Sequence, residues 1–211
     1  MFGRLLDLDT ALFRLANGAA GHPAIDRVMV FVTTQDHWVP VLAGLWIALV
    51  VWGGKKGRMA AAMLVIAVAL SDQLSCSVLK PLVARVRPSN ALPADAVRLL
   101  VGRSKAFSFP SAHAANSFAA ATVLSWRWPR FALLAFALAA LVAYSRVRVG
   151  LHYPGDVLGG AVVGLTCGRG AIWMVAASAR WFDRVRASRR GPDPTDAPRS
   201  SPPAGSVASE P

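Results

Sequence analysis

The sequence predicts an all-α membrane protein, a polytopic helical bundle with five to six transmembrane helices. Apolar residues make up 55% of the 211 residues and charged residues only 16%, well below the roughly 25% of a typical soluble domain. The long Ala/Leu/Val runs also lack the period-two alternation of a transmembrane β-barrel. Because only helices and closed barrels satisfy their backbone hydrogen bonds in lipid, we expect these runs to be helices.

Five apolar stretches approach the roughly 20 residues that a helix needs to cross a bilayer. In chain order they are 38–52, 59–79, 111–126, 131–144 and 157–179. A further apolar run, 24–32, is too short to span unaided, so a sixth crossing stays open.

The chain divides into three predicted regions. Residues 1–36 form an N-terminal interfacial region, because Leu5, Leu8, Leu12 and Leu15 share one face of an amphipathic helix. Residues 37–182 form the transmembrane domain. Residues 183–211 are rich in Arg, Pro and Ser and are predicted to be disordered. The N-terminus lacks the pattern of a signal peptide, so insertion is expected to rely on the internal spans.

The formal net charge of +12 points to an anionic partner. Nucleic acid is not expected, because a nucleic-acid binder does not normally combine this charge with this hydrophobicity. The basic clusters 55–58, 127–130 and 180–190 predict the cytoplasmic side. The segments 80–109 and 145–156 then face the extracytoplasmic side.

The sequence offers no metal-ligand spacing. Its two cysteines, Cys76 and Cys167, lie inside apolar runs and are interpreted as small buried hydrophobes. No acidic cluster suited to magnesium or zinc is present either. We therefore expect no metal and no cofactor.

A first polar cluster follows the predicted helix 59–79. Lys80 and Arg87 lie seven residues apart, and Pro88 follows. An Arg fork and a Lys point charge can clamp a phosphate. Taken alone, basic residues that snorkel to lipid headgroups are the favoured interpretation.

A second cluster, Pro110-Ser111-Ala112-His113, opens the predicted helix 111–126. Ser111 suits an N-cap position, and the free backbone N–H groups at a helix start attract phosphate. His113 in the first turn can donate a proton to a leaving alkoxide. A capping serine beside an interfacial histidine explains the same residues about equally well.

A third cluster runs from Ser145-Arg146 to His152 and Asp156. A carboxylate four residues after a histidine can accept the N–H of one ring nitrogen and leave the other as an oriented nucleophile. Arg146 adds a cation for phosphate oxygens. Ionisable residues at a membrane face are costly, which favours a functional role.

In order along the chain, the clusters resemble the three signature motifs of the phosphatidic acid phosphatase type 2 and vanadium haloperoxidase superfamily. These motifs are Lys-x6-Arg-Pro, Pro-Ser-Gly-His and Ser-Arg-x5-His-x3-Asp. One departure is present: Ala112 stands where the family has glycine, which adds a methyl group beside a phosphate-contacting backbone. The resemblance covers about residues 38–180.

The resemblance implies the phosphatidic acid phosphatase type 2 fold and a metal-independent lipid phosphatase. His152 would attack phosphorus to form a phosphohistidine, Asp156 would orient its ring, and His113 would protonate the leaving group. The phosphate would be bound by Lys80, Arg87, Ser111 and Arg146. The expected partners are the membrane and a lipid phosphate, such as phosphatidic acid, phosphatidylglycerol phosphate or undecaprenyl pyrophosphate.

Two alternatives stay open at this point. The same cations can hold vanadate for halide oxidation, and a non-catalytic protein can bind lipid phosphates. Peroxide-dependent halogenation after vanadate loading would reveal the first, and lipid binding without phosphate release the second. The oligomeric state and the physiological lipid are not predicted.

Several residues outside the motifs have two interpretations. Asp72 is assigned a structural role, while Asn116 and Ser117 either line a pocket or join helices. The remaining basic residues near the motifs either raise the positive potential or form a solvated loop; they are Arg85, Arg98, Arg103, Lys105 and Arg148.

Overall fold

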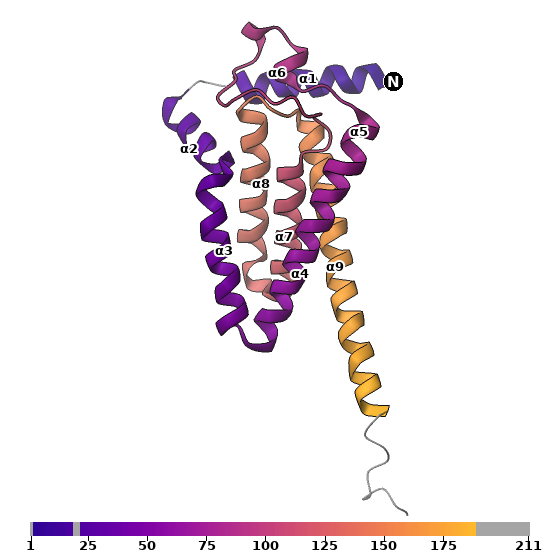
Figure 1. The fold of residues 1–211 in the computed structure, drawn as a ribbon. Helices are drawn as coiled ribbons and strands as arrows, with labels where there is room; N and C mark the ends of the chain where they lie inside the picture. The colour runs from indigo at the N-terminus through magenta and orange to yellow at the C-terminus, as the bar shows by residue number, and fades with distance from the viewer. Residues whose placement is uncertain (1, 19–21, 189–211) are drawn as a thin grey trace, which may run out of the picture. The chain divides into compact units, whose positions relative to one another are not determined.

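The computed structural model describes residues 2–18 and 22–188, and every regular element in these ranges is helical (Figure 1). The elements are α1 (Phe2–Gly18), α2 (Pro23–Thr33), α3 (Gln35–Trp52), α4 (Gly54–Gln73), the π-helix η1 (Leu74–Leu79), α5 (Lys80–Val83), α6 (Pro88–Ala91), the 3₁₀-helix η2 (Ala94–Ala96), α7 (Ala112–Arg127), the 3₁₀-helix η3 (Pro129–Phe131), α8 (Ala132–Arg148) and α9 (Pro154–Ser188). The prediction of an all-α fold is confirmed.

Fewer helices qualify as membrane spans than the sequence predicted. Within the described residues, three helical segments are long and apolar enough: Gly54–Ala91, Pro129–Arg148 and Pro154–Arg186. A fourth is added if α2 and α3, which meet at a bend of 51°, count as one broken span. The helix α7 has only 16 residues, short of the roughly 20 that a bilayer requires. The predicted count of five to six is therefore not confirmed by length and composition.

The chain separates into two compact units, Met1–Val175 and Ala176–Pro211. The described part of the second unit is the last segment of α9, where Trp181 and Phe182 stack edge to face. Residues 183–188 of the predicted disordered tail continue this helix, and residues 189–211 lie outside the described residues.

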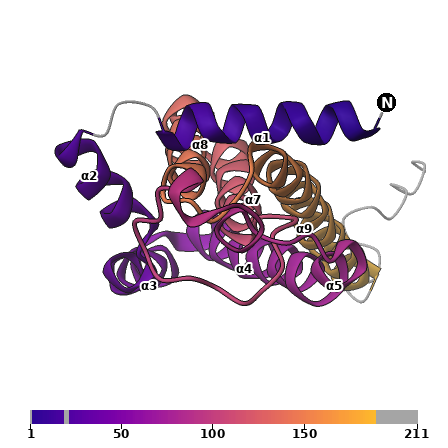
Figure 2. The ribbon, with the colours of Figure 1, turned by 90° about the horizontal axis from the view of Figure 1, so that it is seen from above.

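The helix α7 lies at the centre of the first unit. It packs against α4 and α8, and the view along the bundle shows it among α4, α8 and α9 (Figure 2). Its buried residues are small: Ala114, Ala115, Ala119, Ala121, Thr122 and Val123. Small side chains let neighbouring helices approach closely. The start of α7 is thereby held at one end of the bundle.

Close packing between α7 and α9 depends on glycines spaced four residues apart. Gly160, Gly164 and Gly168 all face α7, and a Cβ added to Gly164 would lie 2.2 Å from the Ala115 carbonyl oxygen. This spacing is the small-residue pattern of helix contacts in membranes. It fixes the beginning of α9, which carries Asp156, against the beginning of α7.

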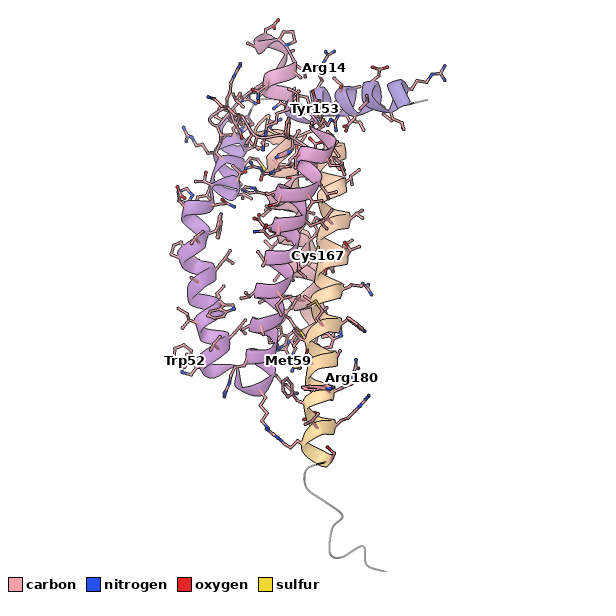
Figure 3. The ribbon with its side chains drawn as sticks, turned by 45° about the vertical axis from the view of Figure 1, so that its right-hand side comes forward. Arg14, Trp52, Met59, Tyr153, Cys167 and Arg180 are labelled. Carbon is pink, nitrogen blue, oxygen red and sulfur yellow. The ribbon has the colours of Figure 1, made fainter. Side chains whose placement is uncertain are left out.

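The N-terminal helix α1 runs across the end of the bundle where α8 stops and α9 starts (Figures 1 and 2). Phe13 is fully buried there and packs edge to face on Tyr153 at 5.4 Å between ring centroids. Figure 3 shows Tyr153 and Arg14 at this end, and Trp52 and Met59 at the opposite end of the bundle. The leucines predicted to face the membrane interface are exposed: Leu5, Leu8, Leu12 and Leu15.

Candidate active site

A polar cavity of about 300 Å³ opens at this end of the first unit. Five of the seven predicted site residues line it: Lys80, Arg87, His113, Arg146 and His152. The other lining residues are Gln35, Asp72, Cys76, Ser104, Ala112 and Asn116. A larger apolar hollow of about 540 Å³ between α1, α7, α8 and α9 contains none of these residues. The three sequence clusters thus meet in the polar cavity.

The remaining two predicted residues lie directly beside the cavity. Ser111 is the N-cap residue of α7, one position before Ala112. Its backbone N–H donates to the Asp156 carbonyl oxygen at 2.9 Å, which joins the second motif to the third. Asp156 is fully buried and lies behind His152 in the first turn of α9.

The imidazole of His152 is buried, with 2% of the residue exposed. Its Nε2 lies 3.2 Å from Nη1 of Arg87. Because a guanidinium donates hydrogen bonds but does not accept them, Nε2 must be the accepting, unprotonated nitrogen. The neutral ring therefore carries its proton on Nδ1, and the lone pair of Nε2 points toward the cavity cations.

The protonated Nδ1 of His152 faces Asp156. It lies 3.6 Å from Asp156 Oδ2 and 3.5 Å from Ser108 Oγ. The hydroxyl of Ser108 itself donates to Asp156 Oδ2, so its oxygen is free to accept from Nδ1. The predicted carboxylate–histidine pair is present, with a serine beside it that the motifs did not indicate.

Burial keeps His152 neutral. It lowers the pKa of this imidazole to about 4, and the neighbouring Asp156 carboxylate opposes the shift. The nearby Arg87 and Arg146 guanidinium groups lower the pKa of His152 further. A neutral imidazole with a free lone pair is the form that acts as a nucleophile.

Two buried donors in the site have no hydrogen-bond partner within the described part of the chain, namely Arg146 Nε and Ser111 Oγ. Arg146 donates to Thr33 Oγ1 through Nη1. Ser111 was expected to cap α7, but its side chain makes no capping hydrogen bond. Buried polar atoms are nearly always paired in proteins, so both donors suit an incoming anion.

Lys80 and Arg87 enter the cavity from the segment after α4. The backbone turns through a left-handed residue, Ala84, between them. Arg87 is anchored by its Nε, which donates to the Ala106 carbonyl oxygen at 2.7 Å. Lys80 Nζ has the thiol of Cys76 as a neighbour at 3.5 Å.

The structure assigns contacts to residues whose roles the sequence left open. Asn116 lies in the cavity wall and donates to Asp72 Oδ1 at 3.1 Å, so it both lines the pocket and joins α7 to α4. Arg85 forms ion pairs with Asp9 and Asp156. Sequence reasoning missed Ser108 and Asp9 entirely, because neither belongs to a motif.

Among residues 2–18 and 22–188, no group of three or more His, Cys, Asp or Glu side chains could hold a metal ion. The basic side chains that line the cavity, Lys80, Arg87 and Arg146, supply nitrogen donors and positive charge. Such donors match the oxygens of a phosphate group.

Comparisons with known proteins agree with this chemistry. The model of the PAP2 superfamily matches residues 60–180. The lipid A 4'-phosphatase of Bacteroides thetaiotaomicron is 38% identical over 168 residues, which cover 76% of this chain and 73% of that protein. The undecaprenyl-diphosphatase of Sulfolobus acidocaldarius is 34% identical over 148 residues, which cover 66% of each protein.

A solved structure is similar as well. The crystal structure of Aquifex aeolicus LpxE superposes with a TM-score of 0.65 at 32% identity, covering 77% of this chain and 93% of that one. The family predicted from the three motifs is confirmed. The chain belongs to the PAP2 superfamily and is an integral-membrane lipid phosphatase.

Proposed function

We propose that this phosphatase transfers the phosphoryl group of its lipid substrate first to His152 and then to water, without a metal ion. The observation that carries the proposal is the accepting Nε2 of a buried, neutral His152 inside a cavity lined by Lys80, Arg87 and Arg146. Phosphoryl transfer depends mainly on positioning and charge stabilisation. Fixed cations supply that stabilisation at the phosphoryl oxygens.

The phosphoryl oxygens are held by Lys80, Arg87, Arg146 and Ser111. The unpaired Arg146 Nε and Ser111 Oγ gain acceptors when the phosphate enters. Arg87 moves its Nη1 donor from His152 Nε2 to a phosphoryl oxygen, and this frees the lone pair for attack. Substrate binding and activation of the nucleophile are therefore one event.

In the first step, the Nε2 lone pair forms a bond to phosphorus as the bond from phosphorus to the lipid oxygen breaks. His113 donates a proton to that leaving oxygen, and Asp156 stabilises the positive charge on the imidazole ring. In the second step, His113 removes a proton from water, whose oxygen attacks phosphorus. The P–N bond breaks, and His152 is restored.

We further propose five crossings, α3, α4, α7, α8 and α9, with the cavity on the extracytoplasmic side of a bacterial cell membrane. The basic residues at the opposite end support this orientation through the positive-inside rule; Arg127 of α7 and Lys56 of α4 are neighbours there. The substrate is a phosphomonoester or diphosphate on a lipid. The lipid A 4'-phosphatase relative favours a phosphomonoester as the first substrate to test.

The proposal is tested by phosphate release from a panel of lipid phosphates and diphosphates, with detergent-purified protein and excess chelator. Wild-type protein is expected to release phosphate and to carry an acid-labile, alkali-stable phosphoryl label after rapid quenching. Both signals are expected to vanish in His152→Ala. Undiminished release in this variant, or a label that persists, would refute the proposed nucleophile.

His37→Ala is the matched control. His37 stacks on Phe31 and does not line the cavity, so turnover and label are expected to stay at wild-type levels. A circular-dichroism spectrum and a melting curve for each variant separate loss of chemistry from loss of folding.

A further inference from the structure

The carboxylate of Asp9 links helix α1 to the catalytic end of the bundle. Its Oδ1 accepts from the Gly155 backbone N–H at 2.7 Å, and its Oδ2 accepts from Arg85 Nη2 at 2.7 Å. The side chain is only 14% exposed. Asp9 therefore contacts the first turn of α9 immediately before Asp156.

Arg85 forms a bridge between two carboxylates. Its Nη1 donates to Asp156 Oδ1 at 2.8 Å, while its Nη2 donates to Asp9 Oδ2. The guanidinium also lies over the Tyr153 ring at 4.1 Å from the centroid. A planar fork held by two carboxylates and an aromatic face has little freedom to rotate.

The ion pair with Arg85 fixes the orientation of the Asp156 carboxylate relative to His152. Arg85 occupies Oδ1, whereas Oδ2 accepts from Ser108 Oγ and from the Tyr153 backbone N–H at 2.8 Å. Oδ2 is also the oxygen that faces His152 Nδ1. The two oxygens of the Asp156 carboxylate therefore have different partners. Because Arg85 binds Oδ1, the carboxylate is held with Oδ2 toward His152.

Charge balance gives Asp9 a second effect. Arg85 alone would neutralise Asp156 and weaken its support of a positively charged His152 ring. With Asp9 present, the group carries two carboxylates and one guanidinium, so net negative charge stays beside the ring. Charges at such short range and low exposure are weakly screened.

We propose that Asp9 and Arg85 are positioning residues that fix the orientation of the Asp156 carboxylate and the charge around it. The N-terminal helix α1 then contributes to the active site. The inference rests on the proposed role of His152. It assigns a catalytic contribution to a residue 143 positions before the nucleophile in the sequence, on a helix that carries none of the three motifs.

The test compares Asp9→Asn with Asp7→Asn. Asp7 lies on the same helix and is exposed, so its variant controls for a lost charge on α1. We expect Asp9→Asn to lower kcat by about 10–100-fold, the loss seen when hydrogen-bond partners that orient metal-binding histidines are removed, with KM little changed. The rate of phosphoryl labelling in a single turnover is expected to fall by the same factor. Binding of orthovanadate, measured as a rise in melting temperature, is expected to be the same in Asp9→Asn as in the wild type.

Two further variants separate positioning from folding. Arg85→Lys keeps a cation but loses the fork, and it is expected to retain more activity than Arg85→Gln. Wild-type kcat in Asp9→Asn, or a loss of kcat that matches only the loss of folded protein, would overturn the inference. Activity retained in His152→Ala would instead overturn the proposed nucleophile, so the two failures are distinguishable.

Discussion

Arg146 and Arg148 lie two residues apart in the last turn of α8, yet their surroundings differ completely. Both are buried, with 8% and 2% of the residue exposed. Arg148 donates to Asp26 through Nε and Nη2 at 3.3 and 3.1 Å, and to the Ala16 carbonyl oxygen at 3.1 Å. Arg146 lines the cavity and contacts Thr33, and its Nε has no partner among residues 2–18 and 22–188.

The helical repeat explains the difference. Residues two apart differ by about 200° around an α-helix, so Arg146 faces the cavity while Arg148 faces α1 and α2. A buried cation that a carboxylate already neutralises contributes to folding. A buried cation without a carboxylate partner is available to a substrate anion. Sequence charge alone does not distinguish the two; the position of the carboxylates does.

The comparison is tested most strongly at Arg146. Arg146→Ala is expected to lower kcat/KM by about 10²–10³-fold, the usual loss when one donor to developing charge is removed. Stability should hold or increase, because the variant removes a buried charge that no carboxylate of the described residues neutralises. Phosphate-release kinetics and thermal melting with and without orthovanadate measure both effects.

Arg146→Lys serves as the control for charge. It keeps the cation but not the planar fork, so its activity is expected between those of wild type and Arg146→Ala. A large loss of stability in Arg146→Ala, with unchanged kinetics of the folded protein, would contradict the comparison.

The second test is at Arg148, where the expected loss is in stability and not in substrate binding. Arg148→Ala is expected to lower the free energy of unfolding by about 3 kcal/mol, because it breaks a buried ion pair and leaves Asp26 with Arg98 as its cation. The protein that stays folded should keep a KM near wild type. Denaturation in detergent measures the loss of stability, and KM is measured on the folded fraction. Weaker substrate binding without a loss of stability would contradict a structural role for Arg148.

The third and smallest effect concerns pH. In the unfolded chain a histidine has a pKa near 6.5, whereas burial lowers that of His152 to about 4. As pH falls below about 6.5, the unfolded state takes up a proton that the folded state does not, so stability is lost until about pH 4. Between pH 7 and pH 5.5, His152 is expected to cost the wild type about 1 kcal/mol.

His152→Gln lacks this titration and provides the reference. The difference in melting temperature between wild type and His152→Gln should be constant above pH 7 and should shift against the wild type at lower pH. A difference that stays constant down to pH 5 would mean that His152 keeps an ordinary pKa.

Much of the site was predictable, because three motifs specify residue types at fixed spacing within short segments. Lys80 and Arg87, or His152 and Asp156, are close enough in the chain for local structure to bring them to one end of the bundle. The apolar runs likewise predicted the helices that carry them. Helix bounds differ from the predicted ones mainly because polar residues such as Gln35 and Arg148 extend α3 and α8 beyond the apolar run.

The residues that the sequence did not indicate share one property: each contacts site residues that are distant in the sequence. Asp9 reaches Gly155 and Arg85, and Thr33 reaches Arg146. An aspartate on an amphipathic helix or a threonine at the end of a short helix carries no local signal of such a contact. These contacts depend on how α1 and α2 pack on α8, which periodicity does not encode.

The π-helix that precedes Lys80 has a consequence for how the chain tolerates insertions and deletions. Over eight residues an ideal α-helix would leave Asp72 and Lys80 about 80° apart, yet both line the cavity. The wider i→i+5 turn of Leu74–Leu79 rotates less per residue and so brings them to one side. Deleting a single residue from this turn would leave a spacing of seven residues between the two side chains. A regular helix turns about 700° over seven residues, so Lys80 would stay within about 20° of Asp72, with every motif residue still present.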